Sequence, residues 1–279
     1  MQAAVRPLHA IVPTVTLAFL MSAGVTSAPR ELRVCADPNN LPFSNQKLEG
    51  FENKLAELIA DDLRATVKYT WLRQRRGFVR RGLKAQECDL VTGIPTASEM
   101  VLATKPYYRS TYVFAYRKSA NLQLRSFDDP ALRQLRIGLH AIGEDGANPP
   151  PVYALAHRGI INNVVGFRMF DVESIENPQG RIIDAVATGD IDVAIVWGPF
   201  AGYFAKRQKE ELEVVPVSPA IEPPGFPFVY EISMGVRPGD TALKAEFDEI
   251  LERRRREVRR ILDEYGVPQV QQGESDDDI

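Results

Sequence analysis

The alternation of strand-like and helix-like segments restricts this chain to few folds. Between residues 31 and 93, short apolar runs typical of strands alternate with segments whose apolar residues recur at helical spacing. Strands joined through helices form parallel sheets with right-handed connections. The sequence therefore predicts a βαβαβ unit, with strands at Glu31–Ala36, Ala65–Leu72 and Asp89–Gly93 and helices at Gly50–Leu63 and Gly77–Lys84.

A second α/β set follows further along the chain. Asn177 is expected to cap a helix that begins at Pro178, because Asn is a favoured N-cap and Pro suits a first turn. The predicted strands of this set are Leu135–His140, Val164–Phe170 and Asp192–Trp197, and the predicted helices are Val152–His157, Pro178–Thr188 and Pro199–Lys209.

The pattern then breaks, and this break predicts two lobes. Leu212–Val217 and Tyr230–Val236 have the character of strands, and Thr241–Tyr265 that of one long charged helix. Two α/β units with a discontinuous return strand form two lobes with a cleft that can close around a ligand. We predict residues 30–117 and 222–270 in lobe 1, 118–221 in lobe 2, and a disordered acidic tail at 271–279.

The segment Thr104–Arg117, TKPYYRSTYVFAYR, lies where the first lobe should end. Tyr112, Phe114 and Tyr116 alternate with smaller or polar residues, which indicates a strand with one buried face. The rings and hydroxyls of Tyr107 and Tyr108 are suited to holding a flat or apolar ligand. We therefore place part of the cleft at this crossover.

The N-terminus has the features of an export signal. Arg6 precedes an apolar stretch, Ala10–Met21, and small residues follow, with cleavage expected after Gly24 or Ala28. We assign residues 1–28 to the signal peptide. No later segment approaches 18 apolar residues, so no membrane insertion is expected after cleavage.

Charge and motif content narrow the function classes. A net charge of −3 gives no support to a nucleic-acid partner. Export permits a disulfide between Cys35 and Cys88; adjacent strands would bring the two thiols together, but different depths in the strands would separate them. The three histidines are not at ligand spacing, so no metal and no cofactor is expected. No catalytic constellation is visible.

The loops that follow the strands hold the candidate cleft residues, because ligands of open α/β sheets bind beyond the carboxyl ends of strands. His140 as a general base lacks an identifiable nucleophile. Trp71 and Trp197 fit either a ligand wall or the core, and Arg109 either an anion contact or a salt bridge at the surface or hinge. The predicted cleft set is Asp37, Asn39, Asn40, Phe43, Trp71, Gly93, Thr96, Tyr107, Tyr108, Arg109, His140 and Trp197.

Several motifs together resemble the type II periplasmic solute-binding proteins of family 3. They include LRVCADPNNLPFS, GFENKLAELIADDL, CDLVTGIPTASE, KPYYRSTYVFAYRK and GDIDVAIVWGPFAGYF, and the resemblance spans Leu32–Gly266. It implies a two-lobed α/β fold, each lobe a mainly parallel sheet flanked by helices, with a two-strand hinge. It also implies a periplasmic binding protein without chemistry of its own.

A narrower resemblance is to the branch associated with quinoprotein alcohol dehydrogenases, which includes the J proteins of methanol dehydrogenase clusters. TWLRQRRGFVR, IGEDGANPPPVYALAHRGI and VWGPFAGYFA carry it. It implies a non-enzymatic accessory protein that helps activate or mature a PQQ-dependent methanol dehydrogenase, with the cytochrome c of that enzyme as a further possible partner. The alternative function is a receptor that delivers a small solute to an ABC transporter.

One departure from the parent family disfavours amino acids as that solute. Amino-acid-binding members carry an Arg about nine residues before Pro-Tyr-Tyr, where its guanidinium clamps the ligand carboxylate. Here the segment ASEMVLATK, residues 97–105, contains no Arg.

Overall fold

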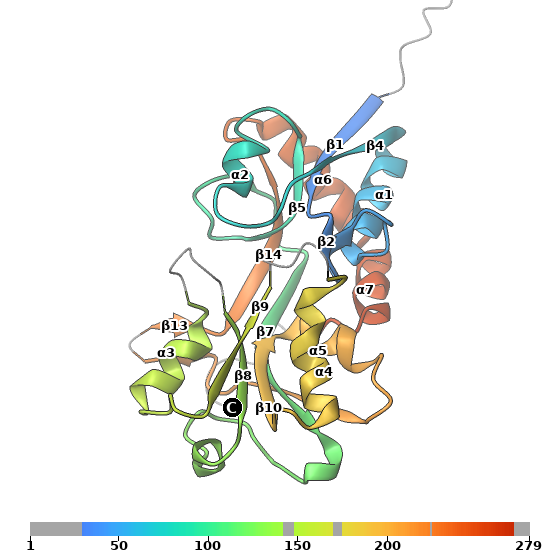
Figure 1. The fold of residues 1–279 in the computed structure, drawn as a ribbon. Coiled ribbons are helices and arrows are strands. Elements are labelled where there is room, and N and C mark those ends of the chain that lie inside the picture. The colour runs from blue at the N-terminus through green and yellow to red at the C-terminus, as the bar shows by residue number, and fades with distance from the viewer. Residues whose placement is uncertain (1–29, 142–147, 170–174, 224, 271–279) are drawn as a thin grey trace, which may run out of the picture.

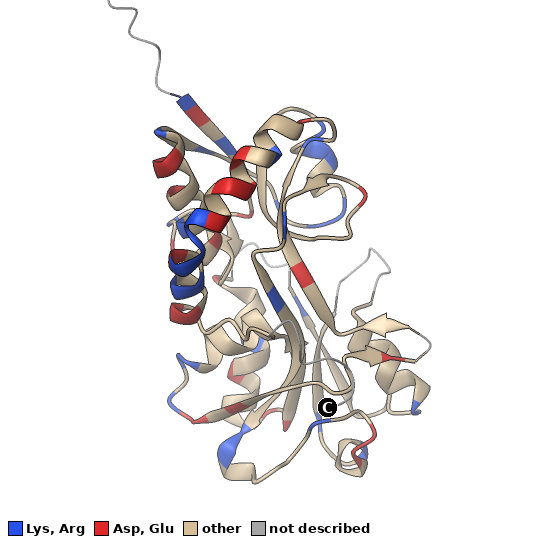
Figure 2. Cartoon of the chain, turned by 180° about the vertical axis from the view of Figure 1, so that it is seen from behind, with Lys and Arg blue, Asp and Glu red and all other residues tan. Residues whose placement is uncertain are grey.

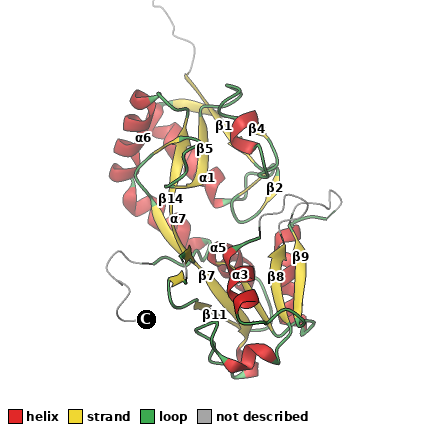
Figure 3. Ribbon diagram, turned by 90° about the vertical axis from the view of Figure 1, so that its left-hand side faces the viewer, coloured by secondary structure: helices red, strands yellow, loops and turns green. Residues whose placement is uncertain are grey.

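The computed structural model describes residues 30–141, 148–169, 175–223 and 225–270. The predicted signal peptide, the acidic tail and most of the loop that follows His140 lie outside these ranges. The described chain forms two groups of strands and helices, joined by strands that run through both (Figures 1 and 3). Lobe 1 is the group that contains the N-terminal strand of the described chain, and lobe 2 is the other group. The residue boundaries predicted for the two lobes remain predictions.

Lobe 1 contains the predicted βαβαβ unit. Strand β1 (Arg30–Ala36) pairs in parallel with both β4 (Ala65–Trp71) and β5 (Leu90–Pro95). Helix α1 (Phe51–Leu63) covers this sheet with Phe51, Leu55 and Ile59, all fully buried at helical spacing. The apolar face of α1 thus packs on one apolar face of the sheet and forms the core of this unit.

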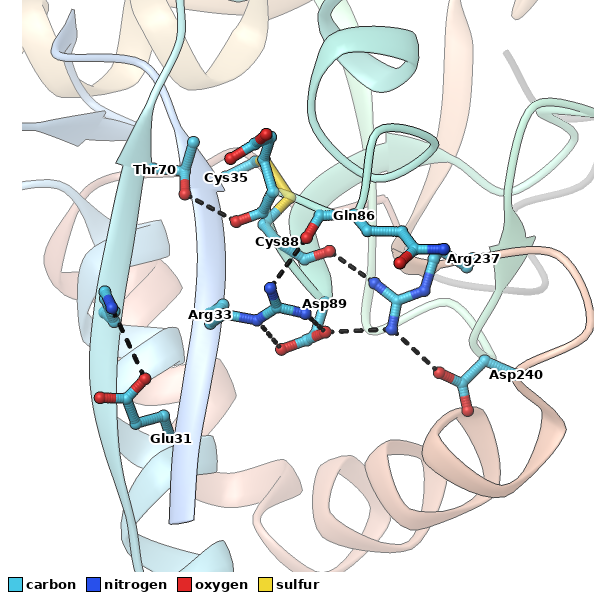
Figure 4. Close-up of polar contacts among 11 residues, drawn as sticks. Glu31, Arg33, Cys35, Thr70, Gln86, Cys88, Asp89, Arg237 and Asp240 are labelled. Atoms are coloured by element: carbon cyan, nitrogen blue, oxygen red, sulfur yellow. Dashed lines mark hydrogen bonds and ion pairs between the residues drawn. A yellow bond between two sulfur atoms is a disulfide. The ribbon is translucent and has the colours of Figure 1, made fainter. Parts of the chain in front are cut away.

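The second helix of lobe 1 is shorter than predicted. Helix α2 spans only Phe78–Arg81, and turns follow it. The chain turns back there, and Cys88, which follows these turns, forms a disulfide with Cys35 of β1, with 5.5 Å between the Cα atoms (Figure 4). Beside the disulfide, Asp89 accepts hydrogen bonds from Arg33 at 2.6 and 2.9 Å and from Arg237 at 3.0 Å.

Lobe 2 is a second α/β layer. Helix α4 (Arg181–Thr188) packs Ile182, Ile183 and Val186 beneath its sheet, all fully buried. The other elements are strands β8 (Ile137–Ala141), β9 (Val164–Arg168), β10 (Val193–Trp197) and β11 (Leu212–Pro216), and helices α3 (Pro150–His157) and α5 (Gly198–Ala205).

The predicted helix start at Asn177 and Pro178 is confirmed in position, but Asn177 makes no side-chain cap bond. Asn177 has a positive φ of 54°, makes no side-chain cap, and precedes the 3-10 turn η3 (Pro178–Gly180) that leads into α4. Its backbone N–H instead donates to Asn39 Oδ1 of lobe 1 at 3.1 Å. The backbone of Asn177 thus bonds to lobe 1, while its side-chain oxygen has no partner in the described structure.

Two strands connect the lobes. The first four residues of β7 (Tyr108–Arg117) pair with β14 (Val229–Val236), and its remaining residues pair with β10 and β11. Strand β14 also pairs with β5 of lobe 1. One curved sheet therefore runs through the molecule in the order β4-β1-β5-β14-β7-β10-β8-β9.

Short elements complete the described fold. They are strands β2 (Asn39–Asn40), β3 (Ser44–Asn45), β6 (Leu102–Ala103), β12 (Ile221–Glu222) and β13 (Phe226–Pro227), and 3-10 turns η1 (Lys118–Ala120) and η2 (Pro130–Arg133).

The predicted long C-terminal helix is interrupted. Helices α6 (Thr241–Arg253) and α7 (Arg255–Glu264) meet at Arg254, whose φ of −97° and ψ of 15° leave the helical region. Arg254 and Arg253 both bind the carboxylate of Asp62 on α1. Figure 2 shows acidic (red) and basic (blue) positions interspersed along the ribbons of these two helices.

The chain after α7 lies against lobe 2. A Cβ on Gly202 of α5 would lie 1.8 Å from the carbonyl oxygen of Gly266, so this close contact requires glycine. Ser110 Oγ donates to Pro268 O at 2.6 Å, and Val270 N donates to Arg109 O at 3.0 Å. The C-terminal segment is thus fixed to β7.

Candidate functional site

A cavity of about 680 Å³ lies between the two lobes. Its size is in the range that holds a drug-sized ligand or a few protein side chains. Lobe 1, lobe 2 and both connecting strands contribute to its wall. The lining residues are Asn40, Phe43, Glu52, Gln74, Arg75, Arg76, Gly93, Ile94, Pro95, Tyr108, Tyr112, His140, Pro149, Met169, Ile195, Val196, Trp197, Phe200, Tyr230 and Ile232.

Aromatic rings form one wall of the cavity. Trp197 stands between Tyr112 and Tyr230, with ring centroids 5.5 and 5.7 Å apart, both edge-to-face. The register of the sheet places them there, since Trp197 of β10 pairs with Tyr112 of β7, which adjoins β14. Three strands thus contribute one ring each to a continuous aromatic surface.

A second aromatic group joins the lobes beside this wall. Phe200 of α5 packs edge-on against Phe43 of lobe 1 at 5.1 Å and against His140 at 5.1 Å. His140 Nε2 lies 3.0 Å from Gln179 O, and since a carbonyl only accepts, Nε2 carries the proton. Burial lowers the pKa of His140 to about 4, so the ring is neutral and Nδ1 is an acceptor.

A buried carboxyl group lines the cavity on the lobe 1 side. Glu52, in the first turn of α1, is 6% exposed, and its Oε2 accepts a hydrogen bond from Thr92 Oγ1 at 2.8 Å. Its Oε1 occupies the space where a side chain of residue 93 would start: a Cβ on Gly93 would lie 2.0 Å from it. Burial raises the pKa of Glu52 to about 7.

Half of the predicted cleft residues line this cavity. They come from the loop after β1, from β5, from β7 and from the ends of β8 and β10, as expected for ligand-facing strand ends. These six are Asn40, Phe43, Gly93, Tyr108, His140 and Trp197.

Two other predicted residues shape the loop after β1 without lining the cavity. Asp37 accepts the backbone N–H of Asn39 at 2.9 Å and of Gln74 at 2.6 Å, which ties two loops together. Asn39 connects the lobes: its Nδ2 donates to Ile175 O at 3.0 Å, and its carbonyl accepts from Gln179 Nε2 at 2.8 Å.

The remaining four predicted residues lie elsewhere. Trp71 stacks on Tyr69 on the edge strand β4. Thr96 bonds to Glu231 O and Ser233. Tyr107 donates to Thr92 O, and Tyr107 and Arg109 line a different hollow beside α6 and α7. No ion pair of Arg109 occurs among the described residues, so the predicted salt bridge is not observed, and its role as an anion contact stays a prediction.

Sequence reasoning missed residues that carry the chemistry of the cavity. Tyr112 shares a strand face with Tyr108, so period-two alternation could have placed it there. Glu52 carried another signal, since it is a charged residue on the apolar face of α1. Tyr230 and Phe200 offered no local signal, because their position depends on how β14 and α5 meet the other elements.

Within the described ranges, no group of three or more His, Cys, Asp or Glu side chains is placed to hold a metal ion. None of the helices in the described part of the chain is long and apolar enough to cross a membrane.

Residues 32–268 match the family model of the bacterial extracellular solute-binding proteins, family 3, and the chain belongs to this family. It is 32% identical over 244 residues to the protein MoxJ of Methylorubrum extorquens. The aligned region covers 85% of this chain and 81% of MoxJ.

Two solved structures agree with this assignment. The periplasmic binding protein XoxJ from Methylobacterium extorquens AM1 is 36% identical, with a TM-score of 0.71. MxaJ from Methlophaga aminisulfidivorans MPT is 25% identical, with a TM-score of 0.76. Each match covers 86% of this chain and 100% of the other. The type II fold and the resemblance to the J proteins, predicted from the sequence, are both confirmed.

Proposed function

We propose that this chain is a periplasmic accessory protein, without catalysis of its own, that binds a PQQ-dependent methanol dehydrogenase and helps its activation or maturation. The observation that carries the proposal is the aromatic wall of Tyr112, Trp197 and Tyr230, together with similarity over 85% to 86% of this chain to proteins named MoxJ, XoxJ and MxaJ. Exposed aromatic surfaces in a concave site are typical anchors for a partner protein.

The contents of the cavity support binding over catalysis. Glu52 is bonded to Thr92, and neutral His140 is bonded to a backbone carbonyl. No hydroxyl or thiol nucleophile is hydrogen-bonded to His140 in the described part of the chain. The segment 97–105 supplies no arginine to clamp a carboxylate, so the amino-acid function of the parent family is disfavoured.

The two tryptophans provide a matched test. Purified protein is mixed with the apo and the holo dehydrogenase, and binding is measured by interferometry. Trp197→Ala removes a ring from the cavity, and we expect a loss of about tenfold or more in affinity. Trp71→Ala removes a ring of equal size outside the cavity and should leave the affinity unchanged. Absence of binding to both forms of the dehydrogenase would overturn the proposal.

A second function, a receptor for a small non-amino-acid solute, is favoured by the cavity volume of about 680 Å³. Thermal-shift screening separates the two functions. A true ligand at about 100 times its Kd stabilises the protein by about 2.7 kcal/mol. A hit combined with a transport defect in cells that lack the gene would favour the receptor.

A further inference from the structure

The carboxyl group of Glu52 has no counter-ion in the described part of the chain. Thr92 Oγ1 donates to Oε2, while Oε1 receives no hydrogen bond from any described residue and lies beside Gly93 at the cavity wall. No Lys or Arg of the described residues forms an ion pair with it. Buried carboxylates are normally paired with a cation or with hydrogen-bond donors. The carboxyl group of Glu52 therefore has an acceptor oxygen available at the cavity wall.

Two further acceptors line the same cavity and also lack a donor. Asn40 is 3% exposed; its Nδ2 donates to Gln74, while its Oδ1 is buried without a partner in the described structure. His140 donates through Nε2 to Gln179 O, which leaves Nδ1 as an acceptor. Acceptors without donors at this wall favour a ligand that carries N–H donors, although Oδ1 of Asn40 is itself buried beneath the cavity surface.

The aromatic wall is compatible with a positive charge. The faces of Tyr112, Trp197 and Tyr230 carry negative π density, and cations bind over such faces most strongly when water is excluded. Arg75 and Arg76 also line the cavity, but both are exposed at its mouth. A cation would thus meet rings and a carboxyl group inside the cavity, and the arginines only at its rim.

We propose that this cavity binds an organic ammonium group, with Glu52 as its counter-ion and the aromatic wall around its hydrocarbon part. An ammonium presents several N–H donors to the open acceptors. A carboxylate ligand would be repelled by the ionised carboxylate of Glu52. A neutral alcohol can donate a hydrogen bond to Glu52 but brings no charge to balance it. The inference does not depend on the dehydrogenase partner, since a free amine and a lysine side chain of a protein share this chemistry.

Proton release should accompany binding. The groups that face Glu52 are Thr92 on β5, the hydroxyls of Tyr107 and Tyr108, Tyr69 on β4, and Asp37 in the loop after β1. None is a cation, and burial raises the pKa of Glu52 to about 7. Below this pH an ammonium has to displace the carboxyl proton, so its affinity should fall about tenfold per pH unit.

The test uses isothermal titration of the intact mature protein with four probes: benzylammonium, benzyl alcohol, benzoate and Nα-acetyl-lysine amide. We expect benzylammonium to bind at pH 8 at least tenfold more tightly than the alcohol and benzoate, and about tenfold more weakly at pH 6. Binding of Nα-acetyl-lysine amide in place of benzylammonium also supports the proposal and identifies a protein side chain as the source.

Two variants complete the test. Glu52→Gln keeps the size of the side chain and should weaken ammonium binding at least tenfold and abolish its dependence on pH. Trp197→Leu should weaken the same probe while circular dichroism shows a folded chain. Unchanged affinity in Glu52→Gln, or equal affinity for all probes, would overturn the proposal. Binding of the wild-type chain to the dehydrogenase is measured separately on the same preparations. Failure to bind ammonium probes and failure to bind the dehydrogenase are therefore distinguishable results.

Discussion

Replacing Glu52 by Gln should reveal two opposite pH dependences that partly cancel in the wild-type chain. Glu52 and His140 both line the cavity, and burial moves their pKa values in opposite directions. Glutamine preserves the shape of the side chain and can still accept the hydrogen bond from Thr92 Oγ1. The substitution therefore removes a titration while keeping the packing.

The contribution of Glu52 falls as pH rises. Its pKa is about 7 in the folded state against an ordinary value of 4.5, so the folded state binds more protons between these values. Stability is then lost as pH increases through this window. One pKa unit corresponds to about 1.4 kcal/mol, which gives a loss of about 3 kcal/mol between pH 4.5 and pH 7.

His140 contributes with the opposite sign. Its folded-state pKa of about 4 lies below the ordinary value of 6.5, so the unfolded state binds more protons between pH 4 and pH 6.5. Stability rises with pH across this window, again by about 3 kcal/mol. Between pH 4.5 and pH 6.5 the two slopes offset each other.

Urea unfolding of four proteins from pH 4 to pH 8 measures both contributions. These are the wild type, Glu52→Gln, His140→Gln, and the double variant as a reference that cancels all other titrations. Relative to the reference, Glu52→Gln should gain about 3 kcal/mol as pH rises to 6.5, and His140→Gln should lose about 3 kcal/mol as pH rises to 7. Flat difference curves would refute the reasoning.

Three other changes test particular contacts. Gly93→Ala should destabilise the chain by about 1–3 kcal/mol, because the new Cβ would lie 2.0 Å from Glu52 Oε1. In a Glu52→Ala background this cost should be smaller, and thermal unfolding of the double-mutant cycle measures the difference. Replacing Cys35 and Cys88 by Ala opens a cross-link with a sequence separation of 53 and should cost about 4 kcal/mol in guanidinium unfolding, while an equal midpoint in both proteins would contradict this. Asn39→Ala removes two interlobe hydrogen bonds and should cost about 1–3 kcal/mol and accelerate amide exchange in η3; unchanged exchange would show that those bonds contribute nothing.

Elements with regular hydrophobic spacing were predictable from the sequence. The positions of β1, α1 and β4 follow from local patterns, because each buries one face on its neighbour. Predictions failed where a distant contact decides the local structure. Helix α2 ends at Arg81, where the chain turns back toward the disulfide of Cys88 with Cys35, and Asn177 at the start of η3 bonds through its backbone to Asn39 of lobe 1 instead of making a side-chain cap bond.

The same distinction applies to the site. Residues after the parallel strands, such as Asn40 and Trp197, were predictable because the carboxyl ends of the parallel strands within each lobe meet at one edge. Glu52 belongs to a helix, and its importance depends on the absence of a side chain at Gly93, 41 positions further along the chain. No local pattern relates these two residues.

The close contact between Gly202 and Gly266 has a mechanical consequence. Backbone atoms in such contact cannot slide far without collision, and the bonds of Ser110 and Val270 fix the same segment to β7. A rigid rotation of one lobe keeps these contacts only if its axis lies close to these atoms, and a rotation about a distant axis breaks them. In such a rotation, the displacement of a residue grows in proportion to its distance from the contact between Gly202 and Gly266. Distances measured between spin labels placed at increasing separations from Gly202 would therefore locate the axis.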